Sequence, residues 1–123
     1  MIIKQFITYI YKMEIVIRIS PAADVHKKWK VWLPGNKVVK FGYKFIDDYT
    51  THKDEVRRLN YLRRHGGAGS CFMTSTMERW GVTGMHTEWF WSRWILYQCK
   101  TMEEAAGFLN TRIFRNKYKV IIS

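Results

Sequence analysis

The sequence is poor in acidic residues, and this scarcity constrains its function more than any other absence. Ten Asp and Glu stand against 21 Lys and Arg in 123 residues, giving a formal net charge of +11 and an isoelectric point near 9.9. Repulsion among uncompensated charges destabilises a folded protein, so solubility alone does not explain this excess. It indicates an anionic partner: nucleic acid, an anionic lipid surface or an acidic protein patch.

Cysteine is also scarce, since the chain contains only Cys71 and Cys99. This pair matches neither a disulfide framework nor a paired-thiol motif. We expect two free, partly buried thiols in a reducing compartment, and a disulfide between them is the alternative that the sequence leaves open. Long hydrophobic runs are missing too. The apolar residues 1–10 are too interrupted to span a bilayer, and they lack the cleavage pattern of a secretory signal.

Motifs for catalysis and for cofactors are absent. The chain has no Walker loop, no dinucleotide glycine fingerprint and no Gly-x-Ser-x-Gly elbow, so we expect no cofactor. Its four His and two Cys lack the spacing of metal ligands, so we expect no metal. His52 and Asp54 invite an acid–base interpretation, but close neighbours on a helix point apart. We predict no catalytic residue and no enzyme, with a metal-dependent nuclease using His52 and Asp54 as a minor alternative.

Aromatic residues, in contrast, are abundant. Six Trp, seven Tyr and seven Phe, in a chain that is 47% hydrophobic, are sufficient for a well-packed core. No repeat, low-complexity tract or linker divides the chain, so we expect a single domain over residues 1–123. Residues 1–20 form an N-terminal strand segment or an extension, with Met13 as a second candidate start. Residues 101–123 supply a final helix and strand.

The clearest local pattern is a β-hairpin. Two β-rich runs, residues 28–33 and 38–42, flank a Pro-Gly-Asn turn at residues 34–36. Alternation along the first run places Lys28, Lys30 and Trp32 on one face, which is therefore basic and carries an aromatic side chain. Alternating Ile residues before Pro21 predict an N-terminal strand, and residues 118–122 predict a C-terminal one.

Helices are expected on both sides of a long glycine-rich connection at residues 66–87, which Trp80 and Met85 should anchor to the core. Thr51 and Asp54 have the spacing of a capping box for a helix over residues 52–65. A second helix over residues 88–100 is apolar around most of its circumference and should be central. Its expected core residues are Phe90, Trp91, Trp94, Leu96 and Tyr97. Thr101 and Glu104 have capping-box spacing for a third helix.

These elements predict an α+β fold, in which a small antiparallel β-sheet (N-terminal strand, hairpin and C-terminal strand) packs on two or three helices. Basic side chains interleave with the aromatic ones. They have the chemistry to hold phosphates and stack bases, or to anchor a protein interface. The residues alone do not separate these alternatives.

Two segments resemble a small, basic, Trp-rich family of unknown function from nucleocytoplasmic large DNA viruses, such as iridoviruses and phycodnaviruses. Residues 48–65 are similar to its pattern Asp-x-Thr-x-His-Lys-Asp-x-x-Arg-x-x-x-Tyr-x-x-Arg-His. Residues 90–97, Phe-Trp-Ser-Arg-Trp-Ile-Leu-Tyr, are similar to its Phe-Trp-Ser-Arg-Trp-x-Leu-Trp signature, with Tyr97 in place of the last Trp. Residues 28–42 resemble its opening hairpin, with Gly35-Asn36 in place of Asp-Gly. The resemblance therefore covers a family-like core of about residues 28–100.

The resemblance implies a context rather than an activity: a virus with a large icosahedral particle, a factory in the host cytoplasm and an internal membrane. We expect a virion protein, a minor capsid protein that binds major or other minor capsid proteins beneath the shell. Anionic lipid heads and nonspecific nucleic acid are further possible partners, and a DNA-packaging protein is the alternative. The predicted partner-binding residues are Lys28, Lys30, Trp32, Arg57, Arg58, Arg63, Arg64 and Arg93. For Arg93, a buried ion pair among the tryptophans is an equal alternative.

Overall fold

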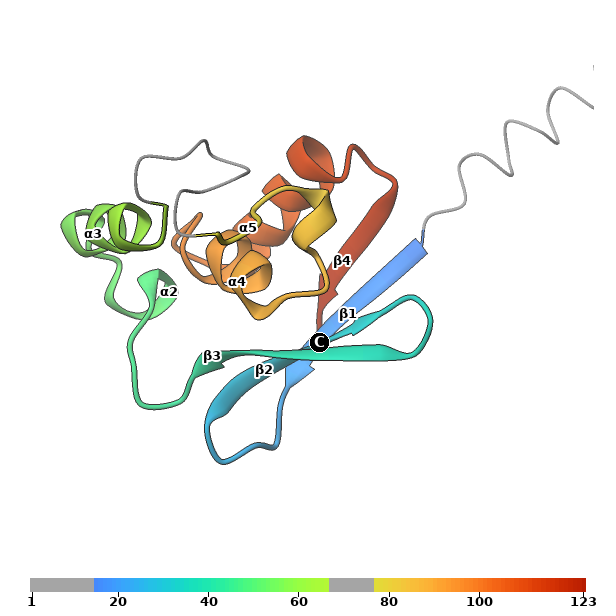
Figure 1. The fold of residues 1–123 in the computed structure, drawn as a ribbon, viewed down its shortest axis with the longest axis horizontal. Helices are drawn as coiled ribbons and strands as arrows, with labels where there is room; N and C mark the ends of the chain where they lie inside the picture. Colours follow the sequence, from blue (N-terminus) through green and yellow to red (C-terminus); the bar gives the residue numbers. More distant parts are fainter. Residues whose placement is uncertain (1–14, 67–76) are drawn as a thin grey trace, which may run out of the picture.

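The computed structural model describes residues 15–66 and 77–123 of the chain (Figure 1). Its strands and α-helices are β1 (Ile15–Pro21), β2 (Lys27–Leu33), β3 (Lys37–Tyr43), α2 (Tyr49–His52), α3 (Glu55–Gly66), α4 (Glu88–Trp91), α5 (Met102–Phe108) and β4 (Tyr118–Ile122). A 3₁₀ turn, η1 (Val82–Gly84), precedes α4. The π-helical turns η2 (Ser92–Leu96) and η3 (Leu109–Ile113) continue α4 and α5. A sheet and separate helices confirm the predicted α+β fold.

The sheet has the strand order β3-β2-β1-β4, and α4, η2 and α5 pack on one of its faces (Figure 1). β2 pairs antiparallel with both neighbours, as predicted, but β4 pairs in parallel with β1, so the sheet is mixed. The expectation of a wholly antiparallel sheet is therefore wrong at this edge. The helices between β3 and β4 carry the chain back across the sheet, and such a crossover returns a strand in parallel.

The predicted hairpin is confirmed with its turn. Gly35 and Asn36 have φ values of 82° and 63°, in the left-handed region that glycine and asparagine tolerate best. In the two strands that flank the turn, Val31 of β2 and Phe41 of β3 are fully buried, whereas Trp32 of β2 is 46% exposed. The alternation read from the sequence therefore assigns the faces of these strands correctly.

The aromatic segment that begins at Glu88 forms the centre of the core. Phe90 and Trp91 are fully buried, as are Ile95 and Leu96 farther along. The predicted core residues of this segment are thus confirmed, except that Tyr97 is only half-buried. The helix is shorter than predicted, because α4 widens into the π-turn η2 and ends at Leu96.

The helix predicted over residues 52–65 is two helices in the structure. Lys53 adopts a left-handed conformation, with φ of 54°, and separates α2 from α3. The capping box lies one turn earlier than predicted, between Asp48 and Thr51, and the side chain of Asp54 accepts from the N–H groups at the start of α3. Two successive caps fit the same string of Asp and Thr residues, and the sequence pattern did not distinguish them.

The expected core anchors and the cap of the last helix are also present in the structure. Trp80 is buried and Met85 packs against the core, as expected of anchors, although residues 67–76 of their connection lie outside the described residues. The hydroxyl of Thr101 caps α5, as predicted. Cys99 is a free, half-buried thiol, whereas Cys71, Met13 and the rest of residues 1–14 lie outside the described part. No helix in the described part is long and apolar enough to cross a membrane.

Candidate binding cleft

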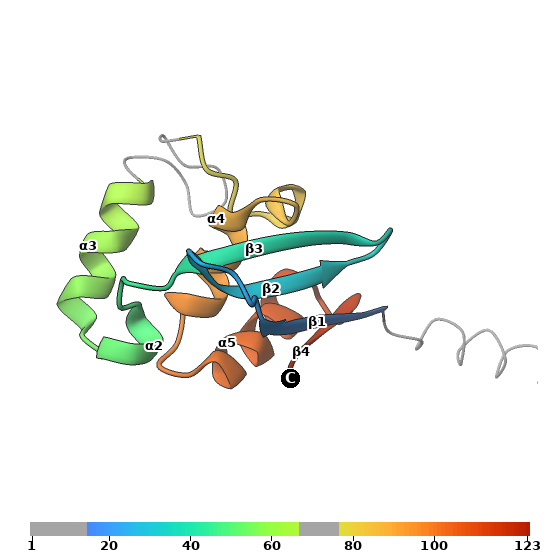
Figure 2. The same cartoon turned by 90° about the horizontal axis from the view of Figure 1, so that it is seen from below.

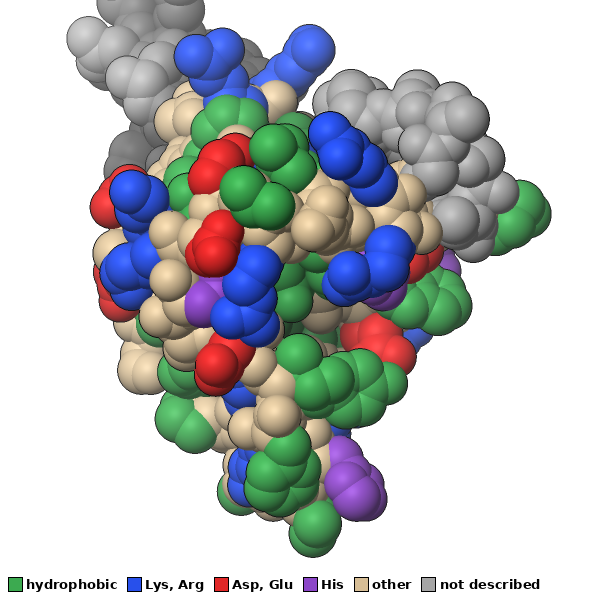
Figure 3. Space-filling model, turned by 90° about the vertical axis from the view of Figure 1, so that its left-hand side faces the viewer, with side chains coloured by type: hydrophobic (Ala, Val, Ile, Leu, Met, Phe, Trp, Pro, Cys, Tyr) green, Lys and Arg blue, Asp and Glu red, His purple; other side chains and the backbone are tan. Residues whose placement is uncertain are grey.

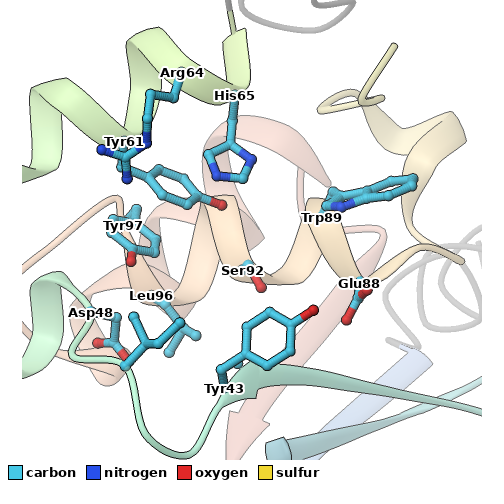
Figure 4. A pocket seen from close by; sticks show the side chains of 12 residues that line it. Tyr43, Asp48, Tyr61, Arg64, His65, Glu88, Trp89, Ser92, Leu96 and Tyr97 are labelled. Carbon is cyan, nitrogen blue, oxygen red and sulfur yellow. The ribbon is translucent and has the colours of Figure 1, made fainter. Parts of the chain in front are cut away.

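Residues 48–65 and residues 90–97 come together around one cleft. It encloses about 260 Å³ between α3, the end of β3 and the α4–η2 segment (Figure 4). Its lining is Gly42, Tyr43, Ile46, Asp48, Tyr61, Arg64, His65, Glu88, Trp89, Ser92, Leu96 and Tyr97. A second hollow of about 190 Å³, which reaches His52, Arg57 and Asn60, shares Ile46, Tyr61, Arg64 and Tyr97 with the first. The two hollows therefore adjoin along α3.

Stacked aromatic rings form the α3 side of the cleft. Tyr61 lies parallel to Tyr97, with 3.5 Å between ring centroids, and its ring also stacks on His65 at 4.1 Å. Burial raises the pKa of Tyr61 well above its usual range, so its phenol stays neutral in the folded protein. In Figure 4 its hydroxyl points into the cleft, opposite the hydroxyl of Tyr43.

A hydrogen-bond network holds the upper part of the cleft. Nδ1 of His65 lies 2.5 Å from a carboxylate oxygen of Glu78, which is buried, and Nε1 of Trp80 donates to its other oxygen. Nε1 of Trp94 in turn donates to the carbonyl of Trp80. Because each polar group is partnered within the protein, this network connects α3 rigidly to the core.

Each of the two carboxylates in the lining has a lysine partner. Asp48 is 4% exposed, accepts from Nζ of Lys28 at 2.9 Å and also caps α2. Glu88 is paired with Lys27. Burial alone would lower the pKa of Lys27, but its hydrogen bond to Glu88 and the attraction of that carboxylate raise it. The acids of the cleft are thus compensated internally.

Arg93 is not a surface contact in this structure. It is 7% exposed, with its guanidinium 4.2 Å from the ring centroid of Trp94 and 5.1 Å from that of Trp80, and it donates to Gln98. This burial argues against a partner contact at Arg93. Of the alternative, a buried ion pair among the tryptophans, the structure bears out the burial and the tryptophan neighbours, whose rings stack on the guanidinium.

The other predicted partner residues fall into three groups. Lys28 is held by Asp48, and Arg58 is held by Glu55 and by the carbonyl of Tyr97. Three exposed arginines on α3 make no ion pair with any described residue: Arg57, Arg63 and Arg64. Lys30 and Trp32 lie on the other side of the sheet, away from the cleft. Of these residues, only Arg57 and Arg64 line the adjoining hollows.

Exposed apolar side chains at the mouth of the cleft were not predicted from the sequence. Tyr43, Ile46 and Trp89 line the cleft and are exposed, and Phe45, which lies between Tyr43 and Ile46 in the chain, is 86% exposed. Figure 3 shows this end of the molecule, where hydrophobic side chains and basic ones surround a hollow. Exposed apolar residues beside a cleft are typical of a site that another molecule covers. The sequence signal for these side chains was Tyr43-x-Phe45-Ile46, between the hairpin and the first helix. Connections are usually polar, so apolar residues there indicate an exposed apolar surface.

His52 and Asp54, the residues of the nuclease alternative, accept backbone hydrogen bonds between α2 and α3. Nδ1 of His52 accepts the backbone N–H of Asp54, and the Asp54 carboxylate accepts from Val56 and Arg57 at the start of α3. Among the described residues, no group of three or more His, Cys, Asp or Glu is placed to hold a metal ion. This geometry gives the nuclease hypothesis no support.

Comparisons with known proteins give a single family match. A model described as a family of unknown function (DUF5754) matches residues 17–65, from β1 to the last turn of α3. No curated protein and no solved structure matches the chain. The matched segment includes the hairpin and the α3 side of the cleft, but not α4 or η2.

Proposed function

We propose that this protein is a non-enzymatic, minor structural component of the virion of a large DNA virus. It is assembled in the host cytoplasm, and it binds a neighbouring major or minor capsid protein beneath the shell. The observation that carries the proposal is the cleft itself, with exposed apolar side chains and uncompensated arginines at its mouth. The resemblance of residues 48–65 and 90–97 to viral sequences supplies the context.

The composition of the cleft favours binding over chemistry. Both lining carboxylates are paired with lysines, and His65 is paired with buried Glu78. A general base needs a lone pair directed at a substrate, and the two lining carboxylates are directed at Lys27 and Lys28 instead. Aromatic walls and arginine, in contrast, are the residue types enriched where protein interfaces have most of their binding energy.

The charges identify the kind of segment that fits the cleft. Arg57 and Arg64 lie seven residues apart on α3 and line adjoining hollows without an acidic partner among the described residues. A planar guanidinium matches a carboxylate with two parallel hydrogen bonds. A volume of about 260 Å³ is at the small end for ligand sites, and this suits one bulky side chain better than a folded surface. We therefore assign an acidic partner segment with an aromatic or aliphatic anchor.

Photocrosslinking in gently disrupted, detergent-treated virions tests this assignment. A photoreactive phenylalanine analogue at Trp89, which lines the cleft and is 46% exposed, should cross-link to a capsid protein. The same analogue at Val38, on the outer face of the sheet, serves as the positional control and should not give that product. Absence of the chain from purified virions, or cross-linking only from Val38, would overturn the proposal.

Charge reversal on α3 supplies a quantitative test with a matched control. Arg63 and Arg64 are adjacent, exposed and without an ion pair among the described residues, but only Arg64 lines the cleft. Arg64→Glu should weaken binding to the cross-linked capsid protein about tenfold or more, the range expected for a central arginine, whereas Arg63→Glu should change it little. Equal losses would mean that only the overall charge of α3 matters.

A further inference from the structure

The outer face of the sheet is a second, separate surface. α4, α5 and the π-turns pack on the opposite face, and no described helix lies in front of the strands in Figure 2. The four strands contain seven Lys and Arg and no Asp or Glu. On this face, Asp24 at the β1–β2 connection compensates Lys40 at 2.9 Å. No ion pair with a described residue is formed by Arg18, Lys30 or Lys119.

Strand register places an aromatic side chain among these cations. Trp32 lies opposite Val38 on one side and Arg18 on the other, and Arg18 lies opposite Ile121. Residues directly opposite one another in a sheet have side chains about 5 Å apart, so Trp32 and Arg18 are neighbours. Nζ of Lys30 lies 5.0 Å from the Trp32 ring centroid. The face therefore presents one exposed ring with cations on two sides.

We propose that this face binds single-stranded nucleic acid, with a base stacked on Trp32 and phosphates held by Arg18, Lys30 and Lys119. Open sheets with aromatic and basic side chains suit single strands, because unpaired bases expose flat faces that an aromatic ring can cover. A duplex hides its bases, and no helix of the described residues lies on this face to enter a groove. Charge complementarity favours a polyanion over a typical protein surface, which presents charges of both signs.

The first test measures binding of a fluorescein-labelled oligothymidylate of about 12 nucleotides, a length within the usual site sizes, by anisotropy. Trp32→Ala should weaken binding about tenfold, because one base–aromatic stack is lost, and Trp32→Phe should retain most of the affinity. Trp89 at the cleft mouth is the matched control, since both tryptophans are 46% exposed. Trp89→Ala should leave the affinity unchanged.

Salt dependence supplies an independent readout. For single strands, the logarithm of the association constant falls with the logarithm of salt concentration, with a slope of about −0.7 per neutralised phosphate. Replacing both Lys30 and Lys119 by Ala should make the slope shallower by about 1.4 units. The Arg57→Ala/Arg64→Ala pair on the cleft side should leave the slope unchanged.

Three results would overturn the inference. One is the absence of measurable oligonucleotide binding at about 150 mM salt, where nucleic-acid proteins still act. Another is a loss of affinity with Trp89→Ala or the α3 arginine variants but not with Trp32→Ala. A third is binding to vesicles of anionic lipid, sensitive to Trp32→Ala, without binding to the oligonucleotide. The first and third outcomes leave the capsid-binding assignment of the cleft intact, whereas the second would place the oligonucleotide at the cleft and count against that assignment too.

Discussion

Arg93 was expected on the surface as a partner contact, but its position in the structure indicates a role in stability. Its charge is buried between Trp80 and Trp94, so removing the side chain removes desolvated cation–π contacts and leaves a cavity. We predict that Arg93→Ala lowers the free energy of unfolding by about 2–4 kcal/mol. Arg93→Lys should recover only part of this, because an ammonium lacks the planar group that stacks on a ring.

Urea denaturation followed by tryptophan fluorescence measures the Arg93 effect. Arg63→Ala is the control, and as an exposed substitution it should stay within about 0.5 kcal/mol of the parent protein. Similar stabilities for Arg93→Ala and Arg63→Ala would show that the contacts between Arg93 and the tryptophans contribute nothing to folding.

The basic residues also show what the sequence could not reveal at the scale of single side chains. Lys28, Arg58 and Arg93 were grouped with Arg57, Arg63 and Arg64 because charge and position along the chain do not distinguish them. The difference lies in contacts distant in sequence: Asp48 for Lys28, the carbonyl of Tyr97 for Arg58, and two tryptophan rings for Arg93. Such partners are determined by the tertiary fold, which local patterns do not encode.

At the scale of elements, α3 docks on the core largely through the ring of Tyr61, and this gives the protein a predictable alkaline limit. Burial raises the pKa of Tyr61 far above its value of about 10 in an unfolded chain. Its contribution to stability is therefore complete below about pH 10 and is lost as the pH rises toward the folded-state pKa. Tyr61 alone should reduce the free energy of unfolding by about 1.4 kcal/mol per pH unit in that range.

Tyr61→Phe keeps the stacked ring and removes the ionisable group. We predict that the parent loses stability more steeply than Tyr61→Phe between about pH 10 and 12, measured by urea denaturation at each pH. Tyr43→Phe, which changes an exposed phenol, should follow the parent. Parallel curves for the parent and Tyr61→Phe would show that the Tyr61 phenol is not protected from solvent.

Two glycines test how tightly the helices on the sheet are packed. An added Cβ at Gly107, on the exposed side of α5, meets nothing within 4 Å. Gly107→Ala should therefore raise the free energy of unfolding by about 0.5–1 kcal/mol, because alanine restricts the unfolded chain and favours helix. At Gly84 the added Cβ would lie 2.0 Å from the carbonyl oxygen of Arg79.

Gly84→Ala should consequently lower the free energy of unfolding by more than about 2 kcal/mol, since the backbone must shift to admit the methyl group. Denaturation of both variants beside the parent measures the two effects together. A destabilised Gly107→Ala or a neutral Gly84→Ala would mean that the backbone around the corresponding glycine differs from this structure.

Elements with a strong local signal were predicted well, and elements defined by distant contacts were not. The hairpin needs only a turn that tolerates left-handed residues, and the aromatic helix needs only its apolar circumference, so both were visible in the sequence. The parallel pairing of β1 with β4 joins residues about 100 positions apart and leaves no local trace. The cleft could not be predicted either, because its walls come from β3, α3 and η2, which are distant from one another in the sequence.

For the whole molecule, the net charge of +11 is divided between surfaces with different chemistry. The end that carries α3 combines arginines with apolar side chains around a cleft (Figure 3). The outer face of the sheet combines cations with one exposed tryptophan. No residue that lines the cleft belongs to the group formed by Arg18, Lys30, Trp32 and Lys119. Together, the two proposals describe a protein that connects a capsid protein to nucleic acid.

Independence of the two surfaces predicts a ternary complex. Adding the capsid protein to the protein–oligonucleotide complex should raise the anisotropy further, and each partner should change the affinity for the other by less than about twofold, because separate rigid sites have no coupling free energy. Trp32→Ala should weaken only the binding of the oligonucleotide and Arg64→Glu only the binding of the capsid protein, and the double variant should show each loss at the size seen in the corresponding single variant. Competition between the two partners would contradict this arrangement, since it would require that they share one surface.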